Sequence, residues 1–536
     1  MIDHLDVTVR GEQRRIDLQP DDAGQKLTRI LRQQGLALNT RCGGKGICDG
    51  CLIDIATADG QTQRMRACEL TPQTLAKAGY EARFTIPGRS LLAHEPQVVS
   101  NFKVRVPWAN NPLWQGERAG VDKPLGCAID IGTTTVALML VELATGRVKA
   151  RVSMFNKQMR YGDDVLTRIN LCSSDERMLG KLQAAVARHT ITPLIEQACE
   201  KAQASVEQIV CHTVAANTTM LHLFAGVDPT SLGLAPFTAP FLEHRQMHTS
   251  DVGLPGDAEV HLLPGAAAYV GADLVAGCLA TGQAYNDKPT LLVDVGTNGE
   301  IILHHGEHLY GCATAAGPAF EGARLSSGMR AADGAVEHIR LTADDETFKL
   351  AIQTIGQADP VGVCGSAYLD FLAEGRRSGL LNVAGRFVLE HEAIGSAGTH
   401  GKRLRLHGNG DASEAVSISE SDVASLLQAK GAIGAGIITL MDKVGLAPAD
   451  IDQVYLAGGF GMHLDVASAC GAGLLPGFEP EQVEAVGNTS LAGAFMALLD
   501  QAILDELKRI GEEIEVIELN LEPMFEMTYI EQLSLP

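Results

Sequence analysis

The chain has few aromatic residues and a shortage of basic ones. Aromatic side chains make up only 4% of its 536 residues, which leaves little material for stacking on nucleic-acid bases. Lysine and arginine number 43 against 65 aspartates and glutamates, so the formal net charge is −22. Such a charge repels phosphate backbones and anionic membrane surfaces at long range. We therefore expect neither a nucleic-acid partner nor a membrane partner.

Export and membrane-spanning segments are also missing from the sequence. The first residues show no basic run followed by an apolar stretch, so we expect no secretory signal. No uncharged apolar run reaches the roughly 20 residues that a membrane-spanning helix needs. The pattern G-x-x-x-x-G-K-S/T is absent too, which disfavours a P-loop nucleotide hydrolase. We expect a cytoplasmic protein, and its length allows several domains.

What the chain does have is a cluster of cysteines. Four of the twelve cysteines, Cys42, Cys48, Cys51 and Cys68, follow the spacing C-x5-C-x2-C-x16-C. Four thiolates can hold two bridged irons, and the glycines of this loop let backbone N–H groups approach the sulfurs. We predict a [2Fe–2S] cluster. A structural zinc site is the alternative, although zinc loops more often use paired C-x2-C units.

The other cysteines and the histidines indicate no second metal site by their spacing. The remaining eight cysteines are scattered singly, and we expect them to be small buried apolar residues. The sixteen histidines show no spacing typical of metal ligands. Two of them, His304 and His305, fall in a predicted hairpin, where we expect them to face solvent.

Residues 1–86 have the pattern of a small β-rich domain. Leu5–Val9 and Arg15–Leu18 alternate apolar and polar residues, which predicts a hairpin. A helix is expected near residues 24–34, and a further strand at Leu52–Ile55. Hairpin, helix, cysteine loop and strand in this order predict a β-grasp, ferredoxin-like domain.

Three further segments follow. Residues 87–124 are rich in proline, asparagine and glycine, which predicts a stiff linker. Both tryptophans lie in it, and they either dock the linker on its neighbours or contact a partner. Residues 125–205 are expected to form a first ATPase lobe, and 206–536 a large C-terminal ATPase domain. Within the first lobe, residues 174–204 read as helix with a break before Pro193.

Two similar turns each follow a buried strand. Asp130 begins the sequence D-I-G-T-T-T, and Asp294 begins D-V-G-T-N-G. The glycine lets the backbone bend close to phosphate oxygens, and the N–H groups and hydroxyls around it can donate to them. The two carboxylates can orient water ligands of Mg²⁺, and one can position an attacking water. Two copies of this turn predict a nucleotide phosphate site.

Candidate roles follow from these turns. Asp130, Asp294 and Glu300 are the candidate catalytic carboxylates, and the first two are expected to hold Mg²⁺ through water. A third glycine turn follows the buried strand Val454–Ala457 and is expected to pass close to the adenosine. The candidate nucleotide-binding residues are Gly132, Thr133, Thr134, Thr135, Asn217, Gly296, Thr297, Asn298, Gly299, Gly458, Gly459 and Gly461.

The order of these motifs resembles the superfamily of acetate and sugar kinases, heat-shock chaperone ATPases and actin over residues 125–500. The resemblance implies a two-lobed, actin-like (ribonuclease H-like) ATPase with connecting helices near Asn217–Phe224 and Thr489–Leu498. The expected fold class is therefore multidomain, with α+β and α/β parts.

The whole chain resembles a narrower family, the reductive activators of corrinoid proteins. A cysteine domain, a proline-rich linker and this ATPase occur together in that family. Four stretches resemble its large C-terminal domain, namely Ala215–His222, Leu234–Phe237, Gly317–Ala323 and Val363–Ala367. The match spans nearly the whole chain.

The resemblance implies a specific activity. Such activators deliver one electron from a [2Fe–2S] cluster to the cobalt(II) of a corrinoid protein of a methyltransferase system, and ATP hydrolysis drives the step to cobalt(I). An upstream electron donor and a tendency towards homodimers are implied as well. ATP can help only by favouring a conformation in which the cobalt is easier to reduce.

Two other interpretations stay open. The chain could be an ATP-driven electron donor to a non-corrinoid enzyme, which would leave cobalt absorption bands unchanged. It could also be a small-molecule kinase with a redox-sensing cluster, which would consume ATP in proportion to an acceptor and tolerate loss of Cys42.

Overall fold

A computed structural model describes residues 2–9, 12–36, 38, 51–57, 61–87, 90, 102, 104–323, 325–344, 347–408, 415–458 and 464–536. The chain forms two compact units. The first comprises Met1–His94, Pro318–Phe371 and Ser378–Leu426, and the second comprises Glu95–Gly317, Leu372–Arg377 and Leu427–Pro536.

The N-terminal part of the first unit is a five-stranded mixed sheet. Its strand order is β2-β1-β5-β3-β4, and β1 pairs with β2 in the predicted hairpin and with β5 in parallel. Helix α1 follows the hairpin, as predicted. The bounds are β1 (His4–Val9), β2 (Glu12–Asp17), α1 (Leu27–Gln33), β3 (Leu52–Thr57), β4 (Thr62–Arg66), α2 (Pro72–Ala78) and β5 (Tyr80–Ile86).

Local sequence signals explain why these elements begin and end where they do. Thr71 caps α2 by accepting a hydrogen bond from the Thr74 N–H at 3.1 Å, and Pro72 occupies the first helical position. Alternate residues of β1 are buried, and Leu5 and Val7 pack with Ile30 of α1 in one apolar core. The helix and the sheet therefore stabilise each other through this core.

The rest of the first unit is built on two small three-stranded sheets, with orders β16-β15-β17 and β18-β19-β20. Two helices, α9 and α10, contribute residues to both units. The bounds are β15 (Ala335–Asp344), β16 (Thr347–Thr354), β17 (Gly362–Val363), α9 (Gly365–Arg377), β18 (Ile394–Ser396), β19 (Lys402–His407), β20 (Val416–Ser419) and α10 (Glu420–Val444).

The first sheet of the second unit has the order β10-β11-β9-β6-β7-β8. Strands β6, β7 and β8 form an antiparallel meander, and β9 adds to β6 in parallel. The bounds are β6 (Leu125–Ile131), β7 (Thr135–Glu142), β8 (Arg147–Phe155), β9 (Ile209–Ala216), β10 (Arg245–His248) and β11 (Glu259–Leu262).

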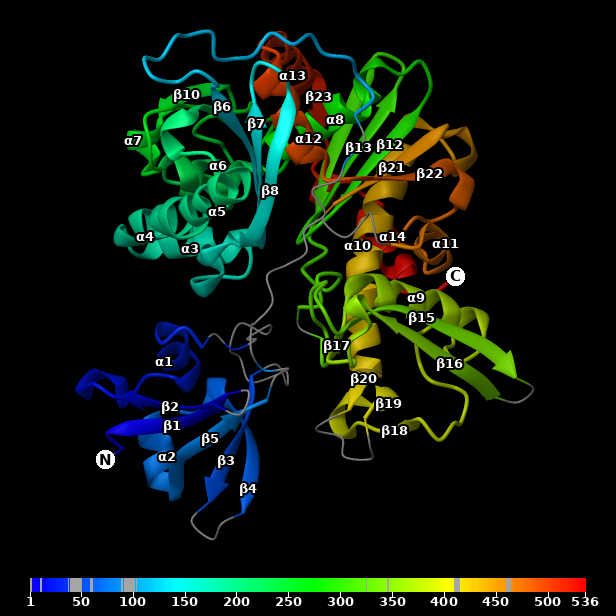
Figure 1. Ribbon diagram of the computed structural model, residues 1–536. Coiled ribbons are helices and arrows are strands. Elements are labelled where there is room, and N and C mark those ends of the chain that lie inside the picture. Colours follow the sequence, from blue (N-terminus) through cyan, green and yellow to red (C-terminus); the bar gives the residue numbers. More distant parts are fainter. Residues whose placement is uncertain are drawn as a thin grey trace. The chain divides into compact units, whose positions relative to one another are not determined.

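Helices gather beside this sheet (Figure 1). They are α3 (Val165–Ser174), α4 (Arg177–Val186), α5 (Thr192–Ala202), α6 (Thr218–Ala225) and α7 (Thr249–Val252). The break predicted before Pro193 takes the form of a π-helical segment, Ala187–Ile191, between α4 and α5. Proline lacks an N–H and its ring collides with the preceding turn, and the wider π turn accommodates both effects without ending the helix.

The second sheet of this unit has the order β22-β21-β12-β13-β14-β23. The bounds are β12 (Thr290–Val295), β13 (Gly299–His305), β14 (His308–Thr314), β21 (Gln453–Ala457), β22 (Val483–Gly487) and β23 (Ile514–Val516). His304 lies on β13, and only 4% of it is exposed, so the prediction that it faces solvent is wrong. Strand β13 lies between β12 and β14, and both of its faces are buried, since Ile301 and Ile302 are fully buried.

Two apolar helices link the two sheets of the second unit. Helix α12 (Thr489–Leu499) packs on β6 and β9, whereas α8 (Ala272–Thr281) touches β9 of one sheet and β12 and β13 of the other. The two helices also pack on each other (Figure 1). Helix α12 matches a predicted connecting helix. The remaining helices are α11 (Val466–Gly471), α13 (Ala502–Glu513) and α14 (Phe525–Gln532).

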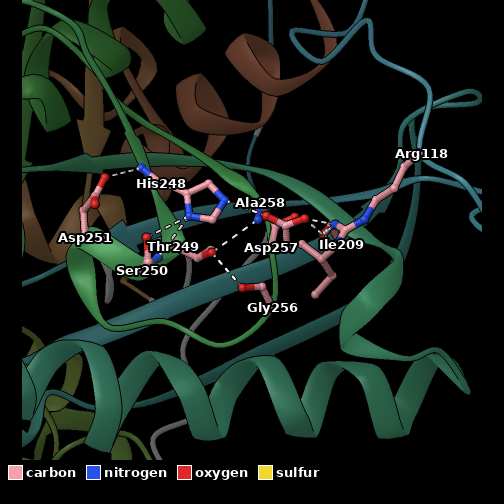
Figure 2. Close-up of polar contacts among 9 residues, drawn as sticks. All are labelled: Arg118, Ile209, His248, Thr249, Ser250, Asp251, Gly256, Asp257 and Ala258. Carbon is pink, nitrogen blue, oxygen red and sulfur yellow. Dashed lines mark hydrogen bonds and ion pairs between the residues drawn. The ribbon is translucent and has the colours of Figure 1, made fainter.

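From Glu95 onward, the proline-rich segment before β6 belongs to the second unit and packs on other elements of it. Trp108 lies edge-on to Phe495 of α12, with ring centroids 5.9 Å apart, which matches the docking alternative for the tryptophans. Arg118 and His248 reach Asp257 from two sides, with an Arg118 Nη2 to Asp257 Oδ2 distance of 3.0 Å (Figure 2). These contacts tie the segment to the sheet that follows it.

Helix α10 is long and apolar enough to cross a membrane by length and composition alone, with a mean hydropathy of 1.5. However, 78% of its apolar window is buried within the protein. This burial is typical of a core helix.

Candidate functional site

The two predicted phosphate turns occupy the same place in two hairpins. Asp130 lies one residue before the end of β6, and Asp294 lies one residue before the end of β12. Each strand then turns directly into an antiparallel partner. A Cβ atom on Gly132 would lie 2.5 Å from the Thr135 carbonyl oxygen, so only glycine fits this turn. The motif thus encodes a tight turn after a buried strand.

The two turns meet through their threonines. The hydroxyls of Thr134 and Thr297 lie 3.2 Å apart, and both side chains are buried. Asn217 donates from Nδ2 to the Thr133 hydroxyl at 3.2 Å while its Oδ1 caps α6. Residues more than 160 positions apart in the chain therefore meet at one place, as the prediction of a shared phosphate site requires.

Asp130 is held by two donors that sequence reasoning missed. Asn488 donates to its Oδ2 at 2.8 Å, and Ser490 donates to its Oδ1 at 2.7 Å. Burial raises the pKa of the Asp130 carboxyl, and these two hydrogen bonds oppose the rise. Asn488 also caps α12, with Oδ1 accepting from the Leu491 N–H. An asparagine directly before a predicted helix was the available signal.

A third carboxylate, Asp273, was also missed. It lies in the first turn of α8. Burial, and then the charge of Asp130, raises its pKa to about 7. An aspartate in the first turn of a helix is common because it interacts favourably with the helix dipole. The local sequence therefore gave no reason to place Asp273 near Asp130.

Asp294 and Glu300 complete a group of four acids, with Asp130 and Asp273. Asp294 and Glu300 are register partners on β12 and β13. Burial, followed by the charges of Asp273 and Asp130, raises the pKa of Asp294 to about 7. Burial, Asp273 and Asp294 together raise the pKa of Glu300 well above its usual range. All four side chains keep some exposure, so a divalent cation could reach and neutralise them.

The third glycine turn lies against the same group. Gly458 has φ of 115°, and a Cβ atom there would collide with the Val295 carbonyl oxygen and lie 3.2 Å from Asp294 Oδ1. This close approach requires glycine. Gly459 and Gly461, the other two predicted residues of the turn, lie outside the described residues.

Two of the four clustered cysteines lie within the described residues. Cys51 and Cys68 are both fully buried, and the Ala67 N–H donates to the Cys51 carbonyl at 3.0 Å, so the chain brings the two residues to one end of the β3–β4 hairpin. Cys42 and Cys48 lie outside the described residues. The structure thus brings together half of the predicted cluster ligands.

Two family models match the chain. Residues 125–285 match the RACo middle region, and residues 288–536 match the C-terminal domain of RACo, the ASKHA domain. A corrinoid activation enzyme, RamQ, from Eubacterium limosum is 30% identical over 566 aligned positions, which cover 92% of this chain and 94% of that protein. The chain belongs to the family of reductive activators of corrinoid proteins.

Other members of the family agree with this assignment. The solved structure of a reductive activator for corrinoid, iron–sulfur protein is 29% identical, with a TM-score of 0.72 over 99% of this chain and 98% of that chain. The Co(II) methylated amine-specific corrinoid protein reductase of Methanosarcina barkeri is 25% identical over 73% of this chain and 72% of its own. The predicted family and the actin-like class of the C-terminal domain are therefore confirmed.

The acidic group draws on both matched regions of the activator. Asp130 and Asp273 lie in the middle region, whereas Asp294 and Glu300 lie in the ASKHA domain. No single region therefore contains the whole group. The catalytic and binding roles of these residues remain predictions.

Proposed function

We propose that this chain is an ATP-dependent reductive activator of a corrinoid protein. It would use one electron and the hydrolysis of ATP to bring the cobalt of its partner from cobalt(II) to cobalt(I). The observation that carries the proposal is the junction of the two phosphate turns, where Thr134 and Thr297 lie 3.2 Å apart beside the four acids. The relatives named as corrinoid activators and reductases supply the substrate class.

The nucleotide part of the proposal rests on the turns and the acids. The N–H groups and hydroxyls of residues 132–135 and 296–299 would bind the phosphates. Asp130 and Asp294 would hold Mg²⁺ through water. The metal charge would offset the burial that raises the pKa of both acids and the repulsion that Asp294 also feels from Asp273 and Asp130. Glu300 or Asp294 would accept a proton from the attacking water.

The electron-transfer part of the proposal rests on the cysteines. Cys42, Cys48, Cys51 and Cys68 would hold a [2Fe–2S] cluster in a ferredoxin-like domain, and the cluster supplies one-electron transfer when bound. The fit is supported by Cys51 and Cys68, which lie together at the end of a hairpin within the described residues. An upstream electron donor would load the cluster.

The cytoplasm is the proposed location. Seven of the eight scattered cysteines are buried, as expected, and Cys470 is half-buried. This usage suits a reducing compartment.

The test is an anaerobic assay with a corrinoid protein, a reductant and MgATP, followed by visible absorption of cobalt(I). We expect cobalt(I) only when ATP is present. Cys68→Ala should lose iron and electron delivery while it keeps ATP hydrolysis, and Asp294→Asn should keep iron and lose hydrolysis. Equal cobalt(I) formation without nucleotide would contradict the proposal.

The same assay separates the alternatives. Unchanged cobalt bands with ATP-dependent reduction of another acceptor would indicate a non-corrinoid electron donor. ATP use that follows an added metabolite and survives Cys68→Ala would indicate a kinase.

A further inference from the structure

A second cluster of metal-ligand side chains lies on the first sheet of the second unit, on β9 and β11. These strands are parallel neighbours, and Cys211 is the register partner of Glu259. Side chains two residues apart on a strand share a face, so His261 lies on the same face as Glu259. None of these residues belongs to the acidic group described above.

The atoms of this cluster are close enough to share one ion. The Cys211 sulfur, a Glu259 carboxylate oxygen and a His261 ring nitrogen all lie within 4.8 Å of one another. His261 Nε2 lies 3.3 Å from Glu259 Oε2, and its other nitrogen, Nδ1, lies 3.0 Å from Nε2 of His244. One edge of the His261 ring therefore faces Glu259, and the other edge is held by His244.

The donor chemistry suits a cation. An imidazole nitrogen, a thiolate sulfur and a carboxylate oxygen can each donate a lone pair to a metal ion, and the thiolate and the carboxylate together carry two negative charges. A divalent cation would replace the thiol proton and leave the group neutral overall.

We propose that Cys211, Glu259 and His261 form a zinc site. Sulfur, imidazole nitrogen and carboxylate oxygen are the ligands that Zn²⁺ takes in proteins, whereas Mg²⁺ prefers oxygen alone. Three protein ligands leave a fourth position for water. The Glu259 side chain is 40% exposed, which gives the ion and this water a path from solvent.

His244 positions His261 in this site. A metal-bound imidazole donates its second N–H to a fixed acceptor, which orients the ring. Zinc on His261 Nε2 would leave Nδ1 to donate to His244 Nε2, 3.0 Å away. The ion would tie β9 to β11, and β9 leads directly to Asn217, which contacts the phosphate turn.

The first test measures zinc and iron in the same sample of the full chain. The anaerobically prepared protein is loaded with Zn²⁺ and dialysed against metal-free buffer. We expect one zinc per chain to be lost in Cys211→Ser and His261→Ala, with iron unchanged. The matched control is His338→Ala, because His338, on β15, pairs with the Asp370 carboxylate and not with a thiol. The control should keep its zinc.

A second test does not depend on the buried cysteine. Zn²⁺ should raise the melting temperature of the parent chain, because an ion that binds only the folded state stabilises it. Glu259→Gln, at a partly exposed position, should abolish this rise, and His244→Phe should weaken zinc binding by about 10- to 100-fold. Equal zinc content in the parent and Cys211→Ser, or no zinc and no thermal shift in the parent, would overturn the proposal. Neither result bears on ATP-dependent reduction, so this proposal fails separately from the proposed function.

Discussion

Asp130 and Asp294 follow the same strand-and-turn pattern in two sheets, yet their surroundings differ. The Asp130 carboxylate accepts hydrogen bonds from Asn488 and Ser490. For Asp294, no hydrogen-bond donor to the carboxylate occurs among the residues that the structure describes. Burial, and then the charges of Asp273 and Asp130, raises its pKa to about 7. A repeated backbone motif therefore carries two different carboxylates.

From this difference we expect the two carboxylates to have different roles. A carboxylate that accepts two hydrogen bonds has a fixed orientation and stays ionised more easily, which suits a metal-orienting role. A carboxylate with a pKa near neutrality is suited to take up and release a proton. We expect Asp130 to position Mg²⁺ and Asp294 to respond to the charge of the metal and the phosphates.

The largest effect should come from Asp294→Asn. Removing this charge should lower the rate of ATP hydrolysis on the order of 100-fold, because the metal loses a carboxylate that orients its water ligands and the attacking water loses a proton acceptor. Phosphate release measures the rate. The control Asp257→Asn changes a carboxylate outside the acidic group, and its rate of ATP hydrolysis should stay near the parent value. Unchanged ATP hydrolysis in Asp294→Asn would show that Asp294 takes no part in the reaction.

Removing a hydrogen-bond donor to Asp130 tests the other carboxylate of the pair. Ser490→Ala leaves a partly buried carboxylate short of one hydrogen bond, and we expect the free energy of unfolding to fall by about 1.5–3 kcal/mol. Denaturant unfolding of the second unit measures it. Thr213→Val removes a hydroxyl that donates to the neutral Ala494 carbonyl and should cost less. Equal losses of unfolding free energy in Ser490→Ala and Thr213→Val would mean that the charge of Asp130 does not strengthen its hydrogen bond.

The acidic group should make stability depend on pH. Asp273 and Asp294 have folded-state pKa values of about 7, above the roughly 3.9 of an unfolded aspartate, so the folded chain binds more protons between these limits. Stability without ligand should therefore fall as the pH rises from about 4 to about 7.

Thermal melting at several pH values tests this dependence. We expect a decrease of a few degrees between pH 5.5 and 8, and a smaller decrease in Asp294→Asn or with Mg²⁺ and nucleotide. A decrease of the same size in Asp294→Asn would show that other groups cause it.

The smallest effect should come from the contact between the two turns. Thr134→Val keeps the shape of the side chain and removes one hydroxyl, which should cost about 0.5–1.5 kcal/mol of stability. A double-mutant cycle with Thr297→Val measures how strongly the two hydroxyls depend on each other. Strictly additive losses would mean that the 3.2 Å contact contributes nothing.

Sequence reasoning worked where the signal is local. Alternation placed β1, a buried apolar run placed β12, and glycine and proline placed turns. The resemblance to the actin-like superfamily placed α12. Sequence reasoning also paired the Asp130 and Asp294 turns, because both copies carry the same short motif. It did not find Asp273, Asn488 or Ser490, and it placed His304 in solvent. The partners of these residues come from strands and helices far away in the chain.

The sequence by itself determined the elements, the two phosphate turns, the cysteine spacing and the family, since these depend on residue type over short separations. Only the tertiary structure decided which carboxylate receives donors and which faces other acids. It also placed Cys211 beside Glu259 and His261, 48 and 50 positions further along the chain. The pairing of distant strands creates such neighbours, and no local pattern of residues records it.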